Sequence, residues 1–421
     1  MTHQAVTNRL HFLKKLFAPL AIICLTNAFA SSPCSAQTNM AALRDFGDPN
    51  AKALWHQFAV LENKEAASTL RIMQLGDSHT GGDYFTQALR ENLQQKFGDA
   101  GPGWLTPGYA KNQRSAQVLF KANGQWKMRI SRSEPDNFPL GGFVNQADSN
   151  AQLEIAPKFP LDGLLRVSLW TRKANVAQTG AWKLNFPDGD VRDLPPAVSD
   201  DWQVNYVIGK GNNVASLVLQ AEQNPPELGG IVIDKLSSGV SVDALGIVGA
   251  TQKVVTRWMP EAIKAQLAWR QPALIILSYG TNEAFDTKFE PDVYRAELIE
   301  SIKQIRAAAP NAAVLLIGAP SAAKKTGVGE NVGCRYRLPP ALRAVKSLQR
   351  QIAQEQKTLY WDWSAWMGGQ CAIQRYAQAN PPLARPDLVH FTEEGYAQSG
   401  QALFAALMQR YHDAVKGDKT K

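Results

Sequence analysis

Runs of apolar residues alternate with amphipathic segments over two stretches of the chain. The run "LRIMQL" at 70–75 predicts a buried strand, and the segment after it carries apolar residues four positions apart from Phe85 to Phe97, which predicts one apolar helix face. The same rhythm returns after residue 240, with strands expected at 272–280, 312–320 and 358–363 and helices at 292–309, 340–356 and 392–414. This alternation predicts an α/β fold with a doubly wound parallel sheet.

A different pattern fills the middle of the chain. Between residues 112 and 234, short runs such as "LLRVSLWT" and "ASLVLQA" are separated by Gly, Pro, Asn and Asp, and no long helical period occurs. Closely spaced short strands of this kind are typical of an all-β sandwich. We therefore expect four parts: a leader at 1–36, the first part of an α/β domain at 37–111, an inserted β-sandwich at 112–239, and the second part of the α/β domain at 240–421.

The leader has the features of a secretory signal peptide. Basic residues precede the apolar run 16–30, and small-x-small sites stand at 28–30 and 34–36, so cleavage is expected after Ala30 or Ala36. The apolar run is too short for a membrane span. We expect an exported protein of the periplasm or cell envelope, with no membrane-spanning segment in its mature form.

The chain has four cysteines. Neither Cys24 nor Cys34 follows the small residue that a lipoprotein signal requires, which disfavours that rival interpretation of the leader. Cys24 is expected to leave with the leader, and so is Cys34, so Cys334 and Cys371 remain. Two cysteines in an exported chain predict one disulfide. The alternative is a pair of buried free thiols.

Charge narrows the range of partners. The formal net charge is +8, and it falls to +5 once the leader is removed, because the leader holds three basic residues and no acidic ones. This mild excess, without a stripe of interleaved basic and aromatic residues, argues against a nucleic-acid partner. It weakly suits an anionic polymer of the cell wall. We expect a monomer.

The stretch "QLGDSHTGG" places Ser78 directly after the first predicted strand. A serine hydroxyl needs a base to act as a nucleophile, and histidine is the usual one. Of the six histidines, His390 on the loop before the final helix is the best placed, and Asp387 stands three residues before it. That spacing lets the carboxylate orient the imidazole and leaves Nε2 for the serine. Asp362, near the end of the strand expected at 358–363, is a rival acid.

Three donors for an oxyanion are expected at the same edge of the sheet. Gly249 follows the segment "SVDALGIV" and Asn282 follows the strand at 272–280. Active sites of open α/β sheets lie beyond the carboxyl ends of the strands. The backbone N–H groups of Ser78 and Gly249 and the side-chain amide of Asn282 can therefore donate to a developing negative charge.

The blocks "GDSH", "IVGAT", "GTNE" and "DLVH", in this order, resemble the SGNH (GDSL-type) hydrolase family. The resemblance covers residues 70–108 and 240–411, and it implies a three-layer α/β/α fold. It also implies these roles: Ser78 as nucleophile, His390 as base, Asp387 as orienting acid, and an oxyanion hole from Ser78, Gly249 and Asn282.

Two departures from the family pattern narrow the resemblance. His79 replaces the more usual Leu after the serine, and Glu283 replaces the more usual Asp after the asparagine. Together with export and a β-rich insertion, these variants resemble the peptidoglycan O-acetylesterases. The resemblance implies a serine esterase that removes O-acetyl groups from peptidoglycan glycan strands through an acyl-enzyme, with O-acetylated peptidoglycan or a related polysaccharide as its partner. It also implies that the insertion is similar to a carbohydrate-binding module.

Other chemistries find less support. The sequence has no G-x-S-x-G elbow, H-E-x-x-H, C-x-x-C or phosphate-binding loop, so we expect no metal and no cofactor. The same triad would serve a peptidoglycan or polysaccharide O-acetyltransferase, another secreted SGNH carbohydrate esterase, or a lipase. The polar, basic segment 321–339 disfavours a lipase. A wall-binding protein with a vestigial triad is a further alternative.

Overall fold

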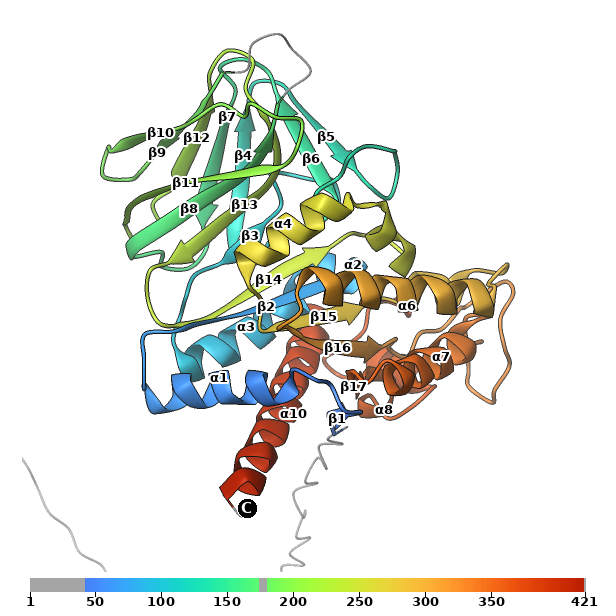
Figure 1. The fold of residues 1–421 in the computed structure, drawn as a ribbon. Helices are drawn as coiled ribbons and strands as arrows, with labels where there is room; N and C mark the ends of the chain where they lie inside the picture. The colour runs from blue at the N-terminus through green and yellow to red at the C-terminus, as the bar shows by residue number, and fades with distance from the viewer. Residues whose placement is uncertain (1–41, 174–179, 420–421) are drawn as a thin grey trace, which may run out of the picture. The chain divides into compact units, whose positions relative to one another are not determined.

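The computed structural model describes residues 42–173 and 180–419 (Figure 1). The leader expected at residues 1–36, with Cys24 and Cys34, lies outside these residues. No helix within the described ranges is long and apolar enough to cross a membrane.

A six-stranded sheet forms the centre of the α/β part. Its strand order is β1-β17-β16-β15-β2-β14, and every neighbouring pair is parallel except β1 with β17. The strands are β1 (Arg44–Asp45), β2 (Thr69–Gly76), β14 (Gly239–Gly246), β15 (Leu274–Ser278), β16 (Ala313–Gly318) and β17 (Leu359–Asp362). The next strand of this sheet along the chain, β14, lies on one side of β2, whereas β15, β16 and β17 follow on the other side. The direction in which the chain adds strands to the sheet therefore changes at β2. Ligand sites of open α/β sheets lie at such a reversal.

Successive side chains of the central strands face two separate cores, which is why the sequences of β15 and β16 are almost entirely apolar. Ile72 packs in one core with residues of α1, α3 and α10, whereas Met73 packs in the other with residues of α4, α6 and α7. Figure 1 shows α4 on one side of the sheet and α1, α3 and α10 on the other. These helices are α1 (Ala51–Asn63), α3 (Tyr84–Phe97), α4 (Pro260–Arg270), α6 (Pro291–Ala308), α7 (Leu342–Glu355) and α10 (Glu393–Lys419). The three-layer α/β/α prediction is confirmed.

Short helices stand at several loops of the α/β part. They are α2 (Ser78–Gly81), the 3-10 helix η1 (Gln252–Arg257), α5 (Thr281–Phe285), α8 (Trp363–Trp366) and α9 (Ala372–Gln378). Of these, α2 follows β2 and α5 follows β15, so both lie beyond carboxyl ends of neighbouring strands.

Two antiparallel sheets form the inserted sandwich, as predicted. One has the order β10-β9-β12-β7-β4, and the other has the order β11-β8-β13-β6-β5 with β3 paired to β13. The strands are β3 (Gly103–Leu105), β4 (Val118–Asn123), β5 (Trp126–Ile130), β6 (Phe143–Ala147), β7 (Gln152–Pro157), β8 (Gly163–Arg172), β9 (Trp182–Asn185), β10 (Val191–Leu194), β11 (Gln203–Gly211), β12 (Leu217–Ala221) and β13 (Glu227–Lys235). Apolar residues of both sheets, among them Ile155 and Val167, fill the core between them. The strand β3 lies before residue 112 and yet pairs with β13 of the sandwich. The domain boundaries expected at 112 and 239 therefore remain a proposal.

The sandwich shares buried contacts with the α/β part. Trp104 and Trp170 stack with their ring centroids 6.2 Å apart and belong to the same apolar core as residues of α4. Arg270, at the end of α4, is fully buried and pairs with Asp234 of β13 and Asp243 of β14, each at 2.7 Å. A buried charge is costly to leave unpaired, so these pairs tie the two parts together.

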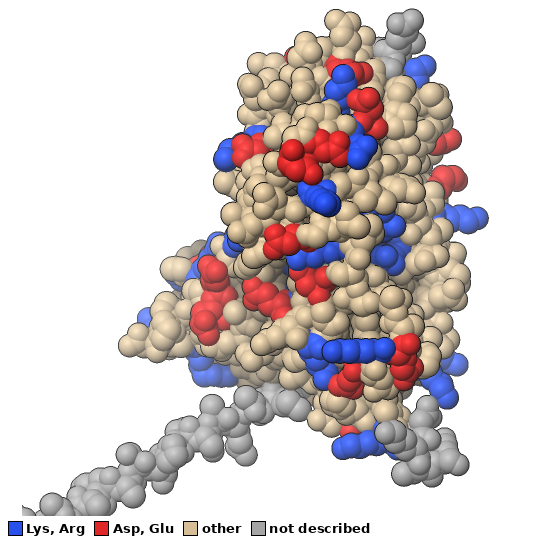
Figure 2. Space-filling model, turned by 90° about the vertical axis from the view of Figure 1, so that its left-hand side faces the viewer, with Lys and Arg blue, Asp and Glu red and all other residues tan. Residues whose placement is uncertain are grey.

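Basic and acidic side chains are interspersed on the face of the molecule shown in Figure 2. Exposed side chains of opposite charge also pair within the sandwich, as Lys121 does with Glu154 and Lys183 with Glu222. Pairs as exposed as these contribute little to stability.

Candidate active site

The Gly-Asp-Ser motif forms a tight turn that presents Ser78 at the start of α2. Asp77 caps this helix by accepting the backbone N–H of His79 at 2.9 Å. A Cβ on Gly76 would collide with the hydroxyl group of Thr80, so only glycine lets α2 fold back over the end of β2. The serine is half-buried at the carboxyl end of a central strand.

Ser78, His390 and Asp387 lie in hydrogen-bonded series. The Oγ of Ser78 is 2.9 Å from Nε2 of His390, and Nδ1 of His390 is 2.9 Å from Oδ2 of Asp387. Partial burial would raise the pKa of Asp387, but its hydrogen bonds with the backbone N–H of Val389 and with His390 outweigh burial and hold the pKa below its ordinary value. An ionised carboxylate only accepts, so Nδ1 carries the proton and Nε2 is left to accept from the serine.

A compact turn holds Asp387 and His390 in place. The backbone N–H of Arg385 donates to the carbonyl oxygen of His390 at 2.8 Å, and the other oxygen of Asp387, Oδ1, accepts the N–H of His390 at 2.9 Å. Leu388 lies between them in the left-handed region, with φ of 59°, and its side chain is buried. A leucine in this region is strained, and nothing in the sequence signals it.

The three expected oxyanion donors follow three adjacent strands. Ser78 follows β2, Gly249 follows β14 and Asn282 follows β15. The Nδ2 of Asn282 donates to the carbonyl oxygen of Ala250 at 2.7 Å. A primary amide has two N–H bonds, so this contact orients the amide and leaves its second N–H for a ligand. Within the described residues, the backbone N–H groups of Ser78 and Gly249 have no hydrogen-bond acceptor.

Two family models match the chain. One is described as "Peptidoglycan O-acetylesterase, N-terminal" and matches residues 100–212, and the other as "GDSL-like Lipase/Acylhydrolase family" and matches residues 214–398. The solved structure "Peptidoglycan O-acetylesterase in action, 5 min" is 30% identical to the chain, and the match covers 88% of this chain and 99% of that one with a TM-score of 0.76. The chain belongs to the peptidoglycan O-acetylesterase family.

More distant structures add nothing to this assignment. A Bacillus subtilis protein is 15% identical, with 74% of this chain and 97% of that chain covered and a TM-score of 0.32. An acetyl xylan esterase is 16% identical, with 40% of this chain and 80% of that chain covered and a TM-score of 0.30. No curated protein matches the chain.

Glu283 is a site residue of this family member to which the sequence assigned no role. Its buried carboxylate accepts the backbone N–H of Gln252 at 2.7 Å and that of Gly280 at 3.1 Å. Together with the Asn282 contact to Ala250, it holds the segment after β14 against the turn after β15. Burial raises the pKa of Glu283 to about 7, and the nearby carboxyl of Asp77 adds to the rise. Glu283 therefore fixes the segments that carry Gly249 and Asn282, two of the expected donors.

His79, the other departure from the usual SGNH pattern, is a buried neutral side chain. Its Nδ1 is 2.9 Å from the hydroxyl oxygen of Tyr396, and its ring centroid is 5.5 Å from that of His390. Burial, followed by the charge of His390, lowers the pKa of His79 to about 3. A neutral ring at this position places no second positive charge beside His390.

A disulfide joins Cys334 to Cys371, with the Cα atoms 5.7 Å apart. It links the loop between β16 and α7 to the residue that precedes α9. The same loop reaches the catalytic turn, because the backbone N–H of Ala323 donates to the carbonyl oxygen of Leu388 at 2.9 Å. The disulfide therefore braces a loop that touches the turn of the acid and the base.

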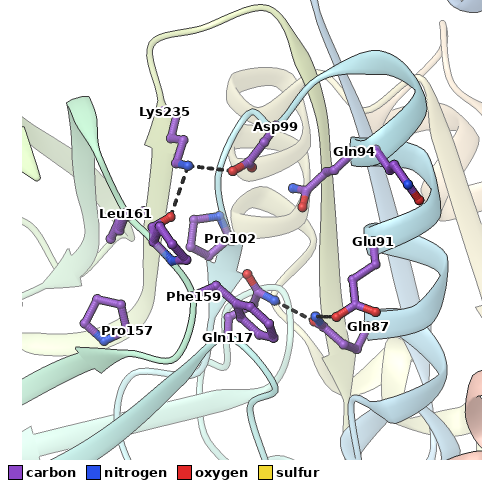
Figure 3. Close-up of a pocket in the computed structure, with 12 residues that line it drawn as sticks. Gln87, Glu91, Gln94, Asp99, Pro102, Gln117, Pro157, Phe159, Leu161 and Lys235 are labelled. Carbon is purple, nitrogen blue, oxygen red and sulfur yellow. Dashed lines mark hydrogen bonds and ion pairs between the residues drawn. The ribbon is translucent and has the colours of Figure 1, made fainter. Parts of the chain in front are cut away.

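A cavity of about 460 Å³ lies between α3 and the sandwich (Figure 3). Gln87, Glu91 and Gln94 of α3 line one wall, and Phe159 belongs to the sandwich side. Lys235 also lines the cavity, and its Nζ donates to the carboxylate of Asp99 and to the backbone carbonyl of Pro160 in the sandwich. Ser78, Gly249, Asn282, Asp387 and His390 do not line this cavity, so it is separate from the candidate active site.

Proposed function

We propose that the protein is a serine esterase that removes O-acetyl groups from the glycan strands of peptidoglycan. The observation that carries the chemistry is the contact of Ser78 Oγ with His390 Nε2 at 2.9 Å, with Asp387 on the other ring nitrogen. The observation that supports the substrate is membership of the peptidoglycan O-acetylesterase family.

The proposed reaction has two halves. His390 Nε2 takes the proton of Ser78 as Oγ attacks the acetyl carbonyl carbon, and the oxyanion is held by the N–H groups of Ser78 and Gly249 and by the free N–H of Asn282. The C–O bond to the sugar then breaks, and His390 returns the proton to the sugar oxygen. In the second half, His390 takes a proton from water as the hydroxide attacks the acetyl-serine, the bond to Oγ breaks as His390 returns that proton to Ser78, and acetic acid leaves and loses its own proton to the solvent as acetate.

Hydrolysis is favoured over transfer of the acetyl group to another sugar. The side chains of His390 and Asp387 are 33% and 46% exposed, so water can approach the acetyl-serine from the side of the base. An acetyltransferase has to keep water away from the same intermediate.

The setting of the reaction is also a proposal. We infer that the protein is exported by its leader to the periplasm or cell envelope and acts there as a monomer. The Cys334–Cys371 disulfide supports an oxidising compartment.

Purified mature protein, incubated with O-acetylated peptidoglycan and a soluble glycan acceptor, tests the proposal. We expect free acetate and no acetylated acceptor. Acetylated acceptor as the main product would identify a transferase, and no release of the acetyl group would reject both activities.

A further inference from the structure

An arginine of the sandwich reaches the oxyanion hole. Arg132 lies in the loop after β5, and a Cβ placed on Gly249 would be 3.0 Å from its Nη1 and 3.5 Å from its Cζ. The guanidinium group therefore occupies the space that a side chain on Gly249 would take. Although Arg132 is contributed by the insertion, it stands beside a residue that we assign to binding the acetyl carbonyl.

The backbone of this loop is anchored to the α/β part. The Nη1 of Arg257 donates to the carbonyl oxygens of Ser131 and Arg132 at 2.9 and 3.0 Å. The indole N–H of Trp258, whose side chain is buried, donates to the hydroxyl oxygen of Ser131 at 3.1 Å. The position of Arg132 is thus set by contacts on both sides of the boundary.

The guanidinium of Arg132 has no carboxylate partner among the described residues, and the side chain is exposed. Arg129, three positions earlier, differs, because it pairs with Asp136 at 3.1 Å and with Glu227 at 2.5 Å. A planar guanidinium fork matches the geometry of a carboxylate and binds it through two parallel hydrogen bonds. An unpaired fork at the rim of a catalytic site is available to an anionic group of the substrate.

We propose that Arg132 is a substrate-binding residue that selects acetyl esters carrying a carboxylate next to the acetylated sugar. This inference rests on the proposed function, and it assigns part of the specificity of that reaction to the sandwich. Peptidoglycan has such groups, because its sugars bear lactyl–peptide substituents that end in carboxylates. Neutral acetyl esters lack the group and gain nothing from Arg132.

Two matched substrates test this inference: a soluble O-acetylated muropeptide, and the same muropeptide with its carboxylates converted to amides. For the wild-type protein we expect kcat/KM to be higher for the carboxylate form. Arg132→Ala should lower kcat/KM for that form roughly tenfold to a hundredfold, mainly through KM, because a hydrogen bond to a charged group is lost. The same substitution should leave kcat/KM for the amide form unchanged. Arg132→Lys keeps the positive charge but loses the planar fork. Its kcat/KM for the carboxylate form should lie between those of the wild-type protein and Arg132→Ala.

Two controls keep the result interpretable. Lys210→Ala removes one positive charge from the exposed surface of β11, and it should leave kcat/KM unchanged for both substrates. Arg132→Gln repeats the test in a variant that keeps a polar side chain. For Arg132→Ala and Arg132→Gln alike, unchanged turnover of the amide form by that variant shows that it is folded. Equal loss on both substrates, or no loss on either, would overturn the inference. If the wild-type protein deacetylates both forms equally well, Arg132 is not selective while the esterase proposal stands. If it deacetylates neither form, the esterase proposal itself fails.

Discussion

The Oγ of Ser78 lies 2.9 Å from the Nε2 of His390, although 312 positions of the chain separate the two residues. They meet because α10, which begins just after His390, packs against α3, which begins just after the turn of Ser78. Gly400 of α10 permits this close approach: a Cβ there would collide with the carbonyl oxygen of Phe85 and lie 2.8 Å from the Cβ of Ala88. The contact of base and nucleophile therefore depends on helix packing as well as on the two loops.

If Ser78 and His390 act as one catalytic unit, as we propose, the effects of losing them should not be additive. Ser78→Ala and His390→Ala should each lower kcat by about 10⁴–10⁶-fold, and the double variant should be little worse than either. Asp387→Asn should cost on the order of 10⁴-fold, because the amide favours the wrong tautomer of His390. Kinetics with a small chromogenic acetyl ester measure all four variants. Substantial turnover by Ser78→Ala would exclude Ser78 as the nucleophile.

Removing one oxyanion donor should slow the chemical step and leave binding almost unchanged. Asn282→Ala loses the free N–H of the amide, so we expect kcat to fall by roughly 10²–10³-fold with little change in KM. Asn282→Asp is the matched variant, since its carboxylate keeps the size of the side chain and cannot donate to an oxyanion or to Ala250. A change confined to KM in both variants would mean that Asn282 binds substrate and does not stabilise the oxyanion.

The buried carboxyl of Glu283 should make stability depend on pH. Its pKa is raised by burial from an ordinary 4.5 to about 7, so between these values the folded protein binds more protons than the unfolded chain. Its contribution to stability is therefore fully present below pH 4.5 and is lost as pH rises through 7. Asp77, whose pKa burial raises from 3.8 to about 6, acts in the same direction at lower pH.

Glu283→Gln removes the titrating group, so the free energy of unfolding should decline less between pH 4.5 and 7 than in the wild-type protein. Urea denaturation at several pH values measures both slopes. Glu300→Gln, at an exposed position of α6, is the control and should keep the wild-type slope. Identical slopes for wild type and Glu283→Gln would show that Glu283 does not titrate in this range.

Loss of the disulfide should destabilise the fold and disturb the catalytic turn. Cys334 and Cys371 are 37 positions apart, and closing a loop of that size stabilises a protein by about 3–4 kcal/mol in the chain-entropy model. The double variant Cys334→Ser, Cys371→Ser should therefore melt at a lower temperature. Its kcat should also fall, because the same loop contacts Leu388. Free alkylation of both thiols in native, unreduced protein would contradict the disulfide.

Much of the fold was predictable because local patterns and long-range packing agree. The strands at 272–280 and 312–320 read as buried on both sides, and the structure places helices on both faces of the sheet. Ser78, Gly249 and Asn282 could be grouped because each directly follows a strand, and parallel strands end at one edge. The rival acid Asp362 instead caps α8 by accepting the N–H of Ala365 at 2.8 Å.

Other features depend on contacts that no local pattern encodes. Glu283 acquires its role from the backbone of Gln252, which a different strand delivers, and an isolated glutamate in a sequence gives no sign of burial. The left-handed Leu388 is held by the packing of its side chain, against its intrinsic preference. Arg132 meets Gly249 across the boundary between two parts of the chain, so only the folded arrangement brings them together.

Release of acetate from purified O-acetylated peptidoglycan tests the central claim most directly, with wild-type protein compared with the Ser78→Ala variant at equal concentration. We expect the wild-type protein to release the bound acetyl groups as free acetate, while the variant, folded by circular dichroism, releases none above the rate of the buffer. Equal release by the two proteins, or no release by folded wild-type protein, would contradict it.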